Sequence, residues 1–187
     1  MEPIIKIAVD AALAGGKIII QALDRLSSIQ VAEKNPNDYV TDIDRRVEKL
    51  ITNAIKKSYP SHGIIGEEYG ETTGDEYQWI IDPVDGTRNF IHGFPYFAIS
   101  IGITYKNKIE HGVIYDPVRD ELFTASRGRG AQLNSHKIRV SEQKKLDKSL
   151  IGTGFAFRPA NKIDYIDVYR DYRYARDCQF NLWPSSD

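Results

Sequence analysis

The amino-acid sequence predicts a protein of the α+β or α/β class whose N-terminal portion contains a mainly antiparallel sheet. Three observations predict it: two helical patterns within the first 60 residues, a series of strand patterns over residues 97–138, and a length of 187 residues. That length fits one domain of ordinary size plus part of a second. We expect an N-terminal α+β domain over residues 1–148 and the start of a C-terminal α/β domain over 149–187, with an atypical tail over 177–187.

The first helix is predicted over residues 3–26. This stretch carries dense Ile, Val, Ala and Leu with charges at wide intervals, which is typical of a largely buried helix, and the small pair Gly15-Gly16 eases its burial.

The second helix follows turn residues at 35–38 and ends at Pro60. Thr41 can cap its first turn, with Asp44 facing back toward the free N–H groups. An apolar stripe at spacings of three and four residues then predicts a buried face. The stripe consists of Ile43, Val47, Leu50, Ile51, Ala54 and Ile55.

Short strands are predicted around Ile64-Ile65 and over residues 78–83, with a loop over 69–77 between them. A meander of antiparallel strands follows, with turns at Lys-Asn, Asp-Pro-Val-Arg-Asp and a Gly-rich segment. Its strand segments cover residues 97–106, 108–117, 121–128 and 131–138, and a further strand over 148–157 and a Tyr-rich helix over 161–177 come after it.

Composition narrows the function classes. Twenty-five Lys and Arg against 26 Asp and Glu, with a net charge of −1, give no general attraction to polyanions, so nucleic acid is not implied. The single cysteine, Cys178, excludes an internal disulfide, and no Cys/His zinc spacing is present. Charges interrupt the most apolar N-terminal stretch, so we predict neither a membrane span nor a signal peptide, and a cytoplasmic protein.

Acidic residues end three apolar elements that are far apart in the chain. Oxygen donors without His or Cys suit a hard cation such as Mg²⁺, which also keeps waters or phosphate oxygens among its ligands. The sequence therefore predicts a metal site. The acidic residues are Asp42 and Asp44 in TDID, Glu67 and Glu68 in GEE, and Asp82 and Asp85 in DPVDG.

The DPVDGT segment also predicts a phosphate site beside the metal. Pro83 holds a bend that would let Asp82 and Asp85 converge on one point, and one carboxylate could then bridge two ions. Gly86 and Thr87 would present backbone N–H groups at the N-terminus of a short helix, where a phosphate is favoured.

Each of these segments has a structural alternative. DPxDG is also typical of a turn, GEE of a solvated loop, and Asp44 of a helix-dipole partner. The Gly-rich segment over 127–131 and the GTGF at 152–155 resemble phosphate loops, but their strand neighbours favour hairpin turns. Four histidines and four tyrosines are interpreted as packing, surface or interface residues: His62, His92, His111, His136, Tyr165, Tyr169, Tyr172 and Tyr174.

Taken together, the segments WIIDPVDGTRNF, IIGEE and DYVTDID resemble the inositol monophosphatase family, from near the N-terminus to about Arg176. YFAISIGI, GVIYDPVRDELFTASRGRGAQLN and IGTGFAF are most similar to its bacterial SuhB-type members. The TRNF ending favours inositol monophosphatases over the related nucleotide 3′-phosphatases. The resemblance implies a layered αβαβα sandwich and lithium-sensitive, Mg²⁺-dependent hydrolysis of inositol 1-phosphate to inositol and phosphate.

The resemblance also implies a ligand set for the metals. Glu67, Asp82 and the main-chain carbonyl of Val84 would hold the first Mg²⁺, and Asp82 with Asp85 would begin the site of the second. Such a two-metal site generates hydroxide near neutral pH and clamps both oxygens of an in-line displacement.

By the same resemblance, Asp44, Thr87 and Glu67 are catalytic, with Asp44 and Thr87 orienting and deprotonating the attacking water. Asp85, Gly86 and Thr87 would bind the substrate phosphate.

Residues 175–187 depart from the family pattern. Family members continue with an RRxGSAALD-like segment and later a WDxAAG-like motif whose aspartate completes the second metal site, and Trp183 and Asp187 are not that motif. A frameshift, premature stop or split reading frame would produce this departure, and a disordered-looking tail is the alternative interpretation. We expect binding of the first metal at best, and hydrolysis reduced by orders of magnitude.

The resemblance implies a homodimer for a complete protein, with a small phosphate monoester as substrate. A different class of function stays open, because SuhB-type members resemble non-catalytic partners of transcription antitermination and ribosomal-RNA maturation. A fragment without function is the third alternative.

Overall fold

The computed structural model describes the backbone of residues 2–26, 29, 31–35, 38–153 and 180–182. The chain divides into one compact unit over Met1–Arg139 and another over Val140–Asp187, and each is described by itself. No helix in the part of the chain that the structure describes has both the length and the apolar character needed to cross a bilayer.

Within the described residues of the first unit, eight strands form one sheet in the order β10-β9-β8-β7-β6-β5-β3-β4. Neighbouring strands run antiparallel except β3 and β5, which are parallel. The predicted fold class and the antiparallel meander are confirmed. The strands are β3 Gly63–Gly66, β4 Gly70–Thr72, β5 Tyr77–Asp85, β6 Ala98–Tyr105, β7 Lys108–Asp116, β8 Glu121–Ser126, β9 Gly130–Leu133 and β10 His136–Ile138.

Two segments differ from the prediction. The predicted loop over 69–77 contains β4, an exposed edge strand of three residues that has no hydrophobic alternation to reveal it. The predicted single strand over 131–138 is two strands, because Asn134 and Ser135 take positive φ angles of 46° and 67° and form a tight turn. The hairpin interpretation of residues 127–131 is correct, with Gly128 and Gly130 at φ of 75° and 78°.

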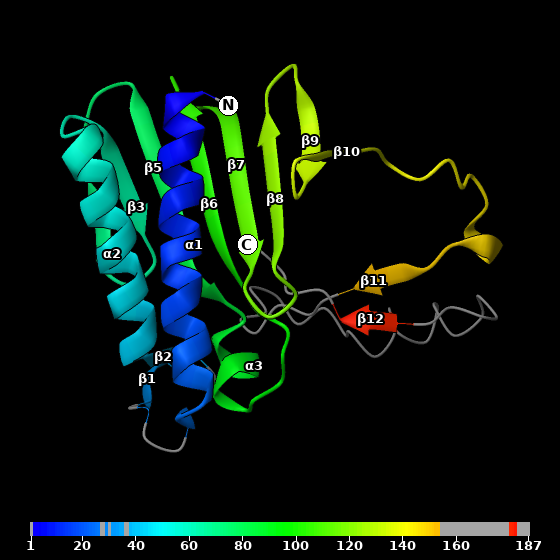
Figure 1. Cartoon of the computed structure of the whole chain (residues 1–187), viewed down its shortest axis with the longest axis horizontal. Helices are drawn as coiled ribbons and strands as arrows, with labels where there is room; N and C mark the ends of the chain where they lie inside the picture. The colour runs from blue at the N-terminus through cyan, green and yellow to red at the C-terminus, as the bar shows by residue number, and fades with distance from the viewer. Residues whose placement is uncertain (1, 27–28, 30, 36–37, 154–179, 183–187) are drawn as a thin grey trace. The chain divides into compact units, whose positions relative to one another are not determined.

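Helices α1 (Pro3–Leu23) and α2 (Asp42–Ser58) lie side by side over one face of this sheet (Figure 1). Helix α1 contacts β6 and β7, and α2 contacts β5. The close approach of α1 depends on Gly16, because a Cβ atom there would lie only 2.4 Å from Cε1 of Tyr115 on β7.

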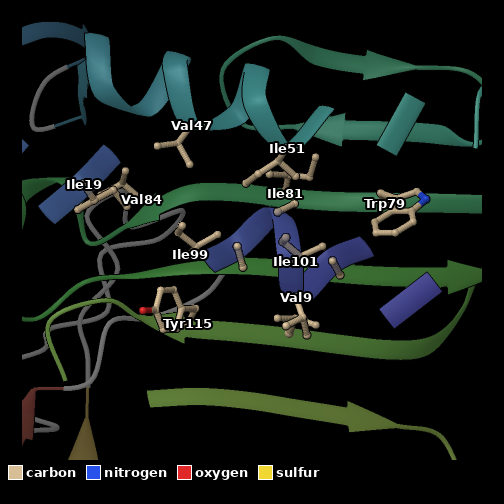
Figure 2. Close-up of a cluster of buried hydrophobic side chains, with 14 of the residues drawn as sticks. Val9, Ile19, Val47, Ile51, Trp79, Ile81, Val84, Ile99, Ile101 and Tyr115 are labelled. Carbon is tan, nitrogen blue, oxygen red and sulfur yellow. The ribbon is translucent and has the colours of Figure 1, made fainter. Parts of the chain in front are cut away.

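Side chains from both helices and the central strands form one hydrophobic core (Figure 2). Trp79 and Ile51 are completely buried in it. Val84, near the end of β5, belongs to the same cluster and is 1% exposed. The core therefore extends to the end of β5, where the predicted site begins.

Two smaller elements lie near that end. Strands β1 (Val31–Asn35) and β2 (Asp38–Thr41) form an antiparallel hairpin around the predicted turn, and β2 contacts both α2 and the short helix α3 (Thr87–Ile91). The short helix predicted after Gly86 is thus present.

In the second unit, β11 (Ile151–Thr153) follows a 3₁₀ turn at Leu146–Lys148 and pairs in parallel with β12 (Phe180–Leu182). Strand β12 lies in the tail that showed no periodic pattern, because three residues are too few to show one. The Tyr-rich helix predicted over 161–177 lies outside the described residues.

Candidate metal and phosphate site

The N-terminus of α2 holds Asp44 in a fixed position. The Thr41 side chain accepts hydrogen bonds from the backbone N–H groups of Ile43 and Asp44, at 3.1 and 3.4 Å. In return Asp44 Oδ2 accepts the backbone N–H of Thr41 at 2.9 Å and the Thr41 hydroxyl. This is the predicted capping arrangement, and Thr41 and Asp44 are both 0% exposed. Since Oδ2 is occupied by the cap, Oδ1 is the oxygen available to the site.

Thr87, the first residue of α3, connects Asp44 to the end of β5. Its Oγ1 lies 3.0 Å from Asp44 Oδ1 and 3.0 Å from the carbonyl oxygen of Val84. A threonine hydroxyl has one proton, so it donates to one of these acceptors at a time. The structure therefore brings together Asp44 and Thr87, which lie 43 positions apart in the chain.

A β-bulge brings Asp82 and Asp85 to one face of the sheet. Asp82 is opposite Ser100 and Asp85 is opposite Ala98, so three steps along β5 match two steps along β6. Residues three apart in a regular strand point to opposite faces, and the extra residue reverses that alternation. The backbone N–H of Val84 also donates to Asp82 Oδ1, at 3.1 Å.

The parallel pairing of β3 with β5 places Glu67 beside Asp82. The backbone N–H of Glu67 donates to the carbonyl of Ile81 at 3.2 Å, in the strand next to the one that carries Asp82. Burial, together with the charges of Glu67 and Asp85, raises the pKa of Asp82 to about 9. Neighbouring carboxyl groups at the end of β5 therefore oppose one another's ionisation.

Burial also raises the pKa of Asp85. The pKa of Asp44 is raised by burial as well, and the hydrogen bonds from Thr41 and Thr87 counteract part of that shift. Oxygen donors alone occupy this cluster, and their shared negative charge is what a divalent cation would compensate.

The donor set fits a hard cation such as Mg²⁺ by its chemistry. Across the described residues, no three Asp, Glu, His or Cys side chains are close enough together to hold an ion by themselves. Mg²⁺ is commonly bound by one or two carboxylates and retains waters, so the pair Glu67 and Asp82 with the Val84 carbonyl meets that requirement.

Gly86 has a structural reason to be glycine. Its φ is 95°, and a Cβ there would lie 2.9 Å from the carbonyl oxygen of Tyr96. Asn89 Nδ2 donates to the same carbonyl at 2.8 Å, which holds the 94–97 segment against α3. Gly86 is thus the residue just before α3, and Thr87 is its first residue.

Two acidic residues that the sequence singled out have other surroundings. Asp42 Oδ1 is buried without a hydrogen-bond partner among the described residues. Glu68 contributes its backbone N–H, which donates to Glu48 Oε2 at 2.7 Å. Sequence reasoning missed Glu48, although its place one helical turn after Asp44 puts both on one face of α2.

A surface hollow of about 540 Å³ lies elsewhere, between β4, β5 and the Lys106-Asn107 turn. None of the predicted site residues lines it. The predicted site residues at the ends of β3 and β5 therefore lie outside this hollow.

Comparison with known proteins gives a consistent result. The family description "Inositol monophosphatase family" matches residues 1–179. A Pseudomonas aeruginosa protein named Nus factor SuhB is 51% identical over 173 residues, covering 90% of this chain and 64% of that protein. The Nus factor SuhB of Escherichia coli K12 is 46% identical over 160 residues, covering 84% of this chain and 60% of that protein. The chain thus spans about 60% of the length of these curated relatives.

Solved structures agree on the fold. The extragenic suppressor protein suhB of Bartonella henselae superimposes with a TM-score of 0.91 at 36% identity, over 98% of this chain and 71% of that one. A Thermotoga maritima IMPase superimposes with a TM-score of 0.86 at 28% identity, over 98% of this chain and 69% of that one.

Proposed function

Because the chain belongs to the inositol monophosphatase family, we propose that it carries the metal and phosphate site of a Mg²⁺-dependent phosphomonoesterase acting on inositol 1-phosphate. The observation that supports this most directly is the contact of Asp44 with Thr87 next to the carboxyl pair of Glu67 and Asp82. The pair Asp44 and Thr87 can orient a water, and the pair Glu67 and Asp82 can hold a cation.

In this proposal Glu67, Asp82 and the Val84 carbonyl hold the first Mg²⁺, and Asp82 and Asp85 contribute to a second. When bound, the cations lower the pKa of a coordinated water and offset the charge on the phosphate oxygens. The Val84 carbonyl oxygen lies 3.0 Å from Thr87 Oγ1, and even when it accepts that hydroxyl it keeps a second lone pair for a metal. Its side chain is anchored in the core, so the carbonyl is held in place.

Asp44 and Thr87 orient the attacking water. Whichever acceptor takes the Thr87 proton, the hydroxyl oxygen retains lone pairs that can accept a hydrogen bond from water. Gly86 and Thr87 N–H groups bind the phosphate. The water oxygen forms a bond to phosphorus, the P–O bond to inositol breaks, and the proton that the water gives up is balanced by the proton that the departing inositol oxygen takes up, so that water is added across the ester.

Phosphate release from inositol 1-phosphate tests the proposal, with Mg²⁺ present or omitted and with or without Li⁺. An Asp82→Asn chain and an exposed Glu71→Gln chain serve as variant and control. The proposal is supported if the unsubstituted chain releases phosphate, Li⁺ inhibits this release and Asp82→Asn abolishes it. It is also supported if the folded unsubstituted chain releases no phosphate but binds Mg²⁺, and Asp82→Asn removes this binding. Release that Asp82→Asn leaves unchanged contradicts it, and so does a folded chain that neither binds Mg²⁺ nor releases phosphate.

The similarity to the relatives named Nus factor SuhB supports a second candidate function, that of a non-catalytic partner in transcription antitermination and ribosomal-RNA maturation. A pull-down with purified transcription elongation factors tests it. Asp85→Asn separates the two functions, because it removes a site carboxylate and leaves the rest of the surface unchanged. Binding retained in this variant supports the partner function, and no binding by the unsubstituted chain contradicts it.

A further inference from the structure

Glu48 is a buried acid that no step of the proposed reaction uses. It lies on α2 and is 1% exposed. Its Oε2 accepts the backbone N–H of Glu68 at 2.7 Å, and its Oε1 accepts that of Tyr69 at 3.1 Å. Both oxygens of one side chain thus bind consecutive N–H groups of the turn between β3 and β4.

The carboxyl group of Glu48 also lies directly against the backbone of Gly66, just before this turn. A Cβ at Gly66 would be 1.9 Å from Glu48 Oε1 and 2.5 Å from its Cδ. No side chain fits between them, so residue 66 must be glycine for Glu48 to reach the turn.

Glu67 lies between these anchor points. Its own N–H is held by the carbonyl of Ile81 at 3.2 Å, and the next two N–H groups are held by Glu48. Tyr69 makes a further contact, from its hydroxyl to the carbonyl of Arg45 at 3.4 Å. The backbone of Glu67 is therefore fixed from both sides, which limits the positions its carboxyl group can take.

Helix α2 joins this anchor to the other half of the site. Asp44 and Glu48 are four residues apart and lie on one face, so a single rigid turn separates them. Asp44 holds Thr87, and Glu48 holds the turn that carries Glu67. A buried carboxyl group is costly to desolvate and needs hydrogen-bond partners, which the turn supplies here.

We propose that Glu48 is a positioning residue, which fixes the 67–69 turn so that the Glu67 carboxylate is aimed at the cation bound with Asp82. This inference rests on the proposed function, since it assumes that Glu67 is a metal ligand. Groups that orient metal ligands in this way typically change metal affinity about 10–100-fold when they are removed. We expect the Glu48→Gln chain to bind the cation at least about 10-fold more weakly.

The chemistry of the substitution is specific. Glutamine has nearly the shape of glutamate but replaces one acceptor oxygen with an NH₂ group, which cannot accept an N–H. One of the two turn N–H groups therefore loses its acceptor. Ile51→Val is the matched control, because Ile51 is completely buried on the same helix and the change lowers stability without touching the turn.

Two readouts that do not depend on turnover test this in the full 187-residue chain. Hydrogen exchange reports the amides of Glu68 and Tyr69, and titration with Mn²⁺, followed by the magnetic resonance signal of the free ion, reports affinity. We expect both amides to be protected in the unsubstituted chain and at least one of them to lose its protection in Glu48→Gln. Ile51→Val should leave the Mn²⁺ affinity of the folded chain unchanged.

Three outcomes would contradict the inference. Rapid exchange of both amides in the unsubstituted chain would show that Glu48 does not fix the turn, and this readout needs no variant to fold. Equal Mn²⁺ affinity in Glu48→Gln and the unsubstituted chain would overturn the positioning role and leave the proposed function intact. No Mn²⁺ binding by the folded unsubstituted chain would overturn the metal site itself, and the positioning role with it.

Discussion

Replacing Gly16 with alanine is expected to destabilise the protein, although alanine is the better helix former. Gly16 lies in α1 where the helix crosses β7. A Cβ there would be 2.4 Å from Cε1 and 2.9 Å from Cδ1 of Tyr115, and 3.1 Å from Cβ of Pro117. Carbon atoms in good contact are about 3.5–4.0 Å apart, so the ring must move by about 1 Å.

The gain in helix propensity opposes the cost of overpacking in the free energy of unfolding. Alanine gains about 1 kcal/mol of helix propensity over glycine. Overpacking of this kind costs about 1–3 kcal/mol. Movement of the ring also strains the hydrogen bond from the Tyr115 hydroxyl to Asp120, which is 2.9 Å long and contributes about 0.5–1.5 kcal/mol. The net expectation is a loss of roughly 2 kcal/mol in the free energy of unfolding.

Urea unfolding measures this difference, with Lys17→Ala as the control at an exposed neighbouring position. Gly15→Ala should cost less, since its Cβ would meet only single atoms of Ile99 and Val47, at 2.8 and 2.9 Å. A Gly16→Ala chain as stable as the unsubstituted one, or more stable, would refute the close packing of α1 on Tyr115.

Four further outcomes are expected. Thr41→Ala removes the α2 cap and should lower the free energy of unfolding by about 1 kcal/mol in urea titrations; an unchanged midpoint would argue against the cap. His62 Nδ1 accepts the Trp79 indole N–H at 2.9 Å. Burial lowers the pKa of His62, so as the pH falls the imidazole is protonated in the unfolded chain before it is protonated in the folded one. The contribution of neutral His62 to stability is therefore complete above a pH of about 6.5 and is lost as the pH falls through the lowered pKa of the folded state. His62→Gln should therefore make the free energy of unfolding depend less on pH on the acid side. If the unsubstituted chain releases phosphate, Thr87→Val should abolish the release while Thr87→Ser retains it, and equal nonzero rates in the two variants would exclude the hydroxyl from the reaction. Mg²⁺ should raise the thermal midpoint of the unsubstituted chain and not that of Asp82→Asn; an equal rise in both would place the ion elsewhere.

The candidate residues of the site could be chosen from the sequence because they lie in short-range patterns. The spacing of Thr41 and Asp44 specifies a helix cap, and this spacing acts within one turn of backbone. The run from Asp82 to Thr87 likewise places two carboxyl groups and a hydroxyl at the end of a strand. Residue types and local spacing were enough to predict which side chains to compare.

Other features depend on contacts between distant segments. The bulge in β5 is visible only in its register with β6, and it brings Asp85 to the face of Asp82. The role of Glu48 could not be read from its neighbours, because its partners are the N–H groups 20 and 21 positions further along the chain.

By itself, the sequence determined the class of the fold, the antiparallel meander, the cap of α2 and the oxygen-only character of the site. Only the tertiary structure decided that β3 pairs in parallel with β5, and hence that the Glu67 N–H binds the carbonyl of Ile81, next to Asp82. Propensity and spacing act over a few residues, whereas strand pairing follows from how the whole apolar surface is buried against α1 and α2.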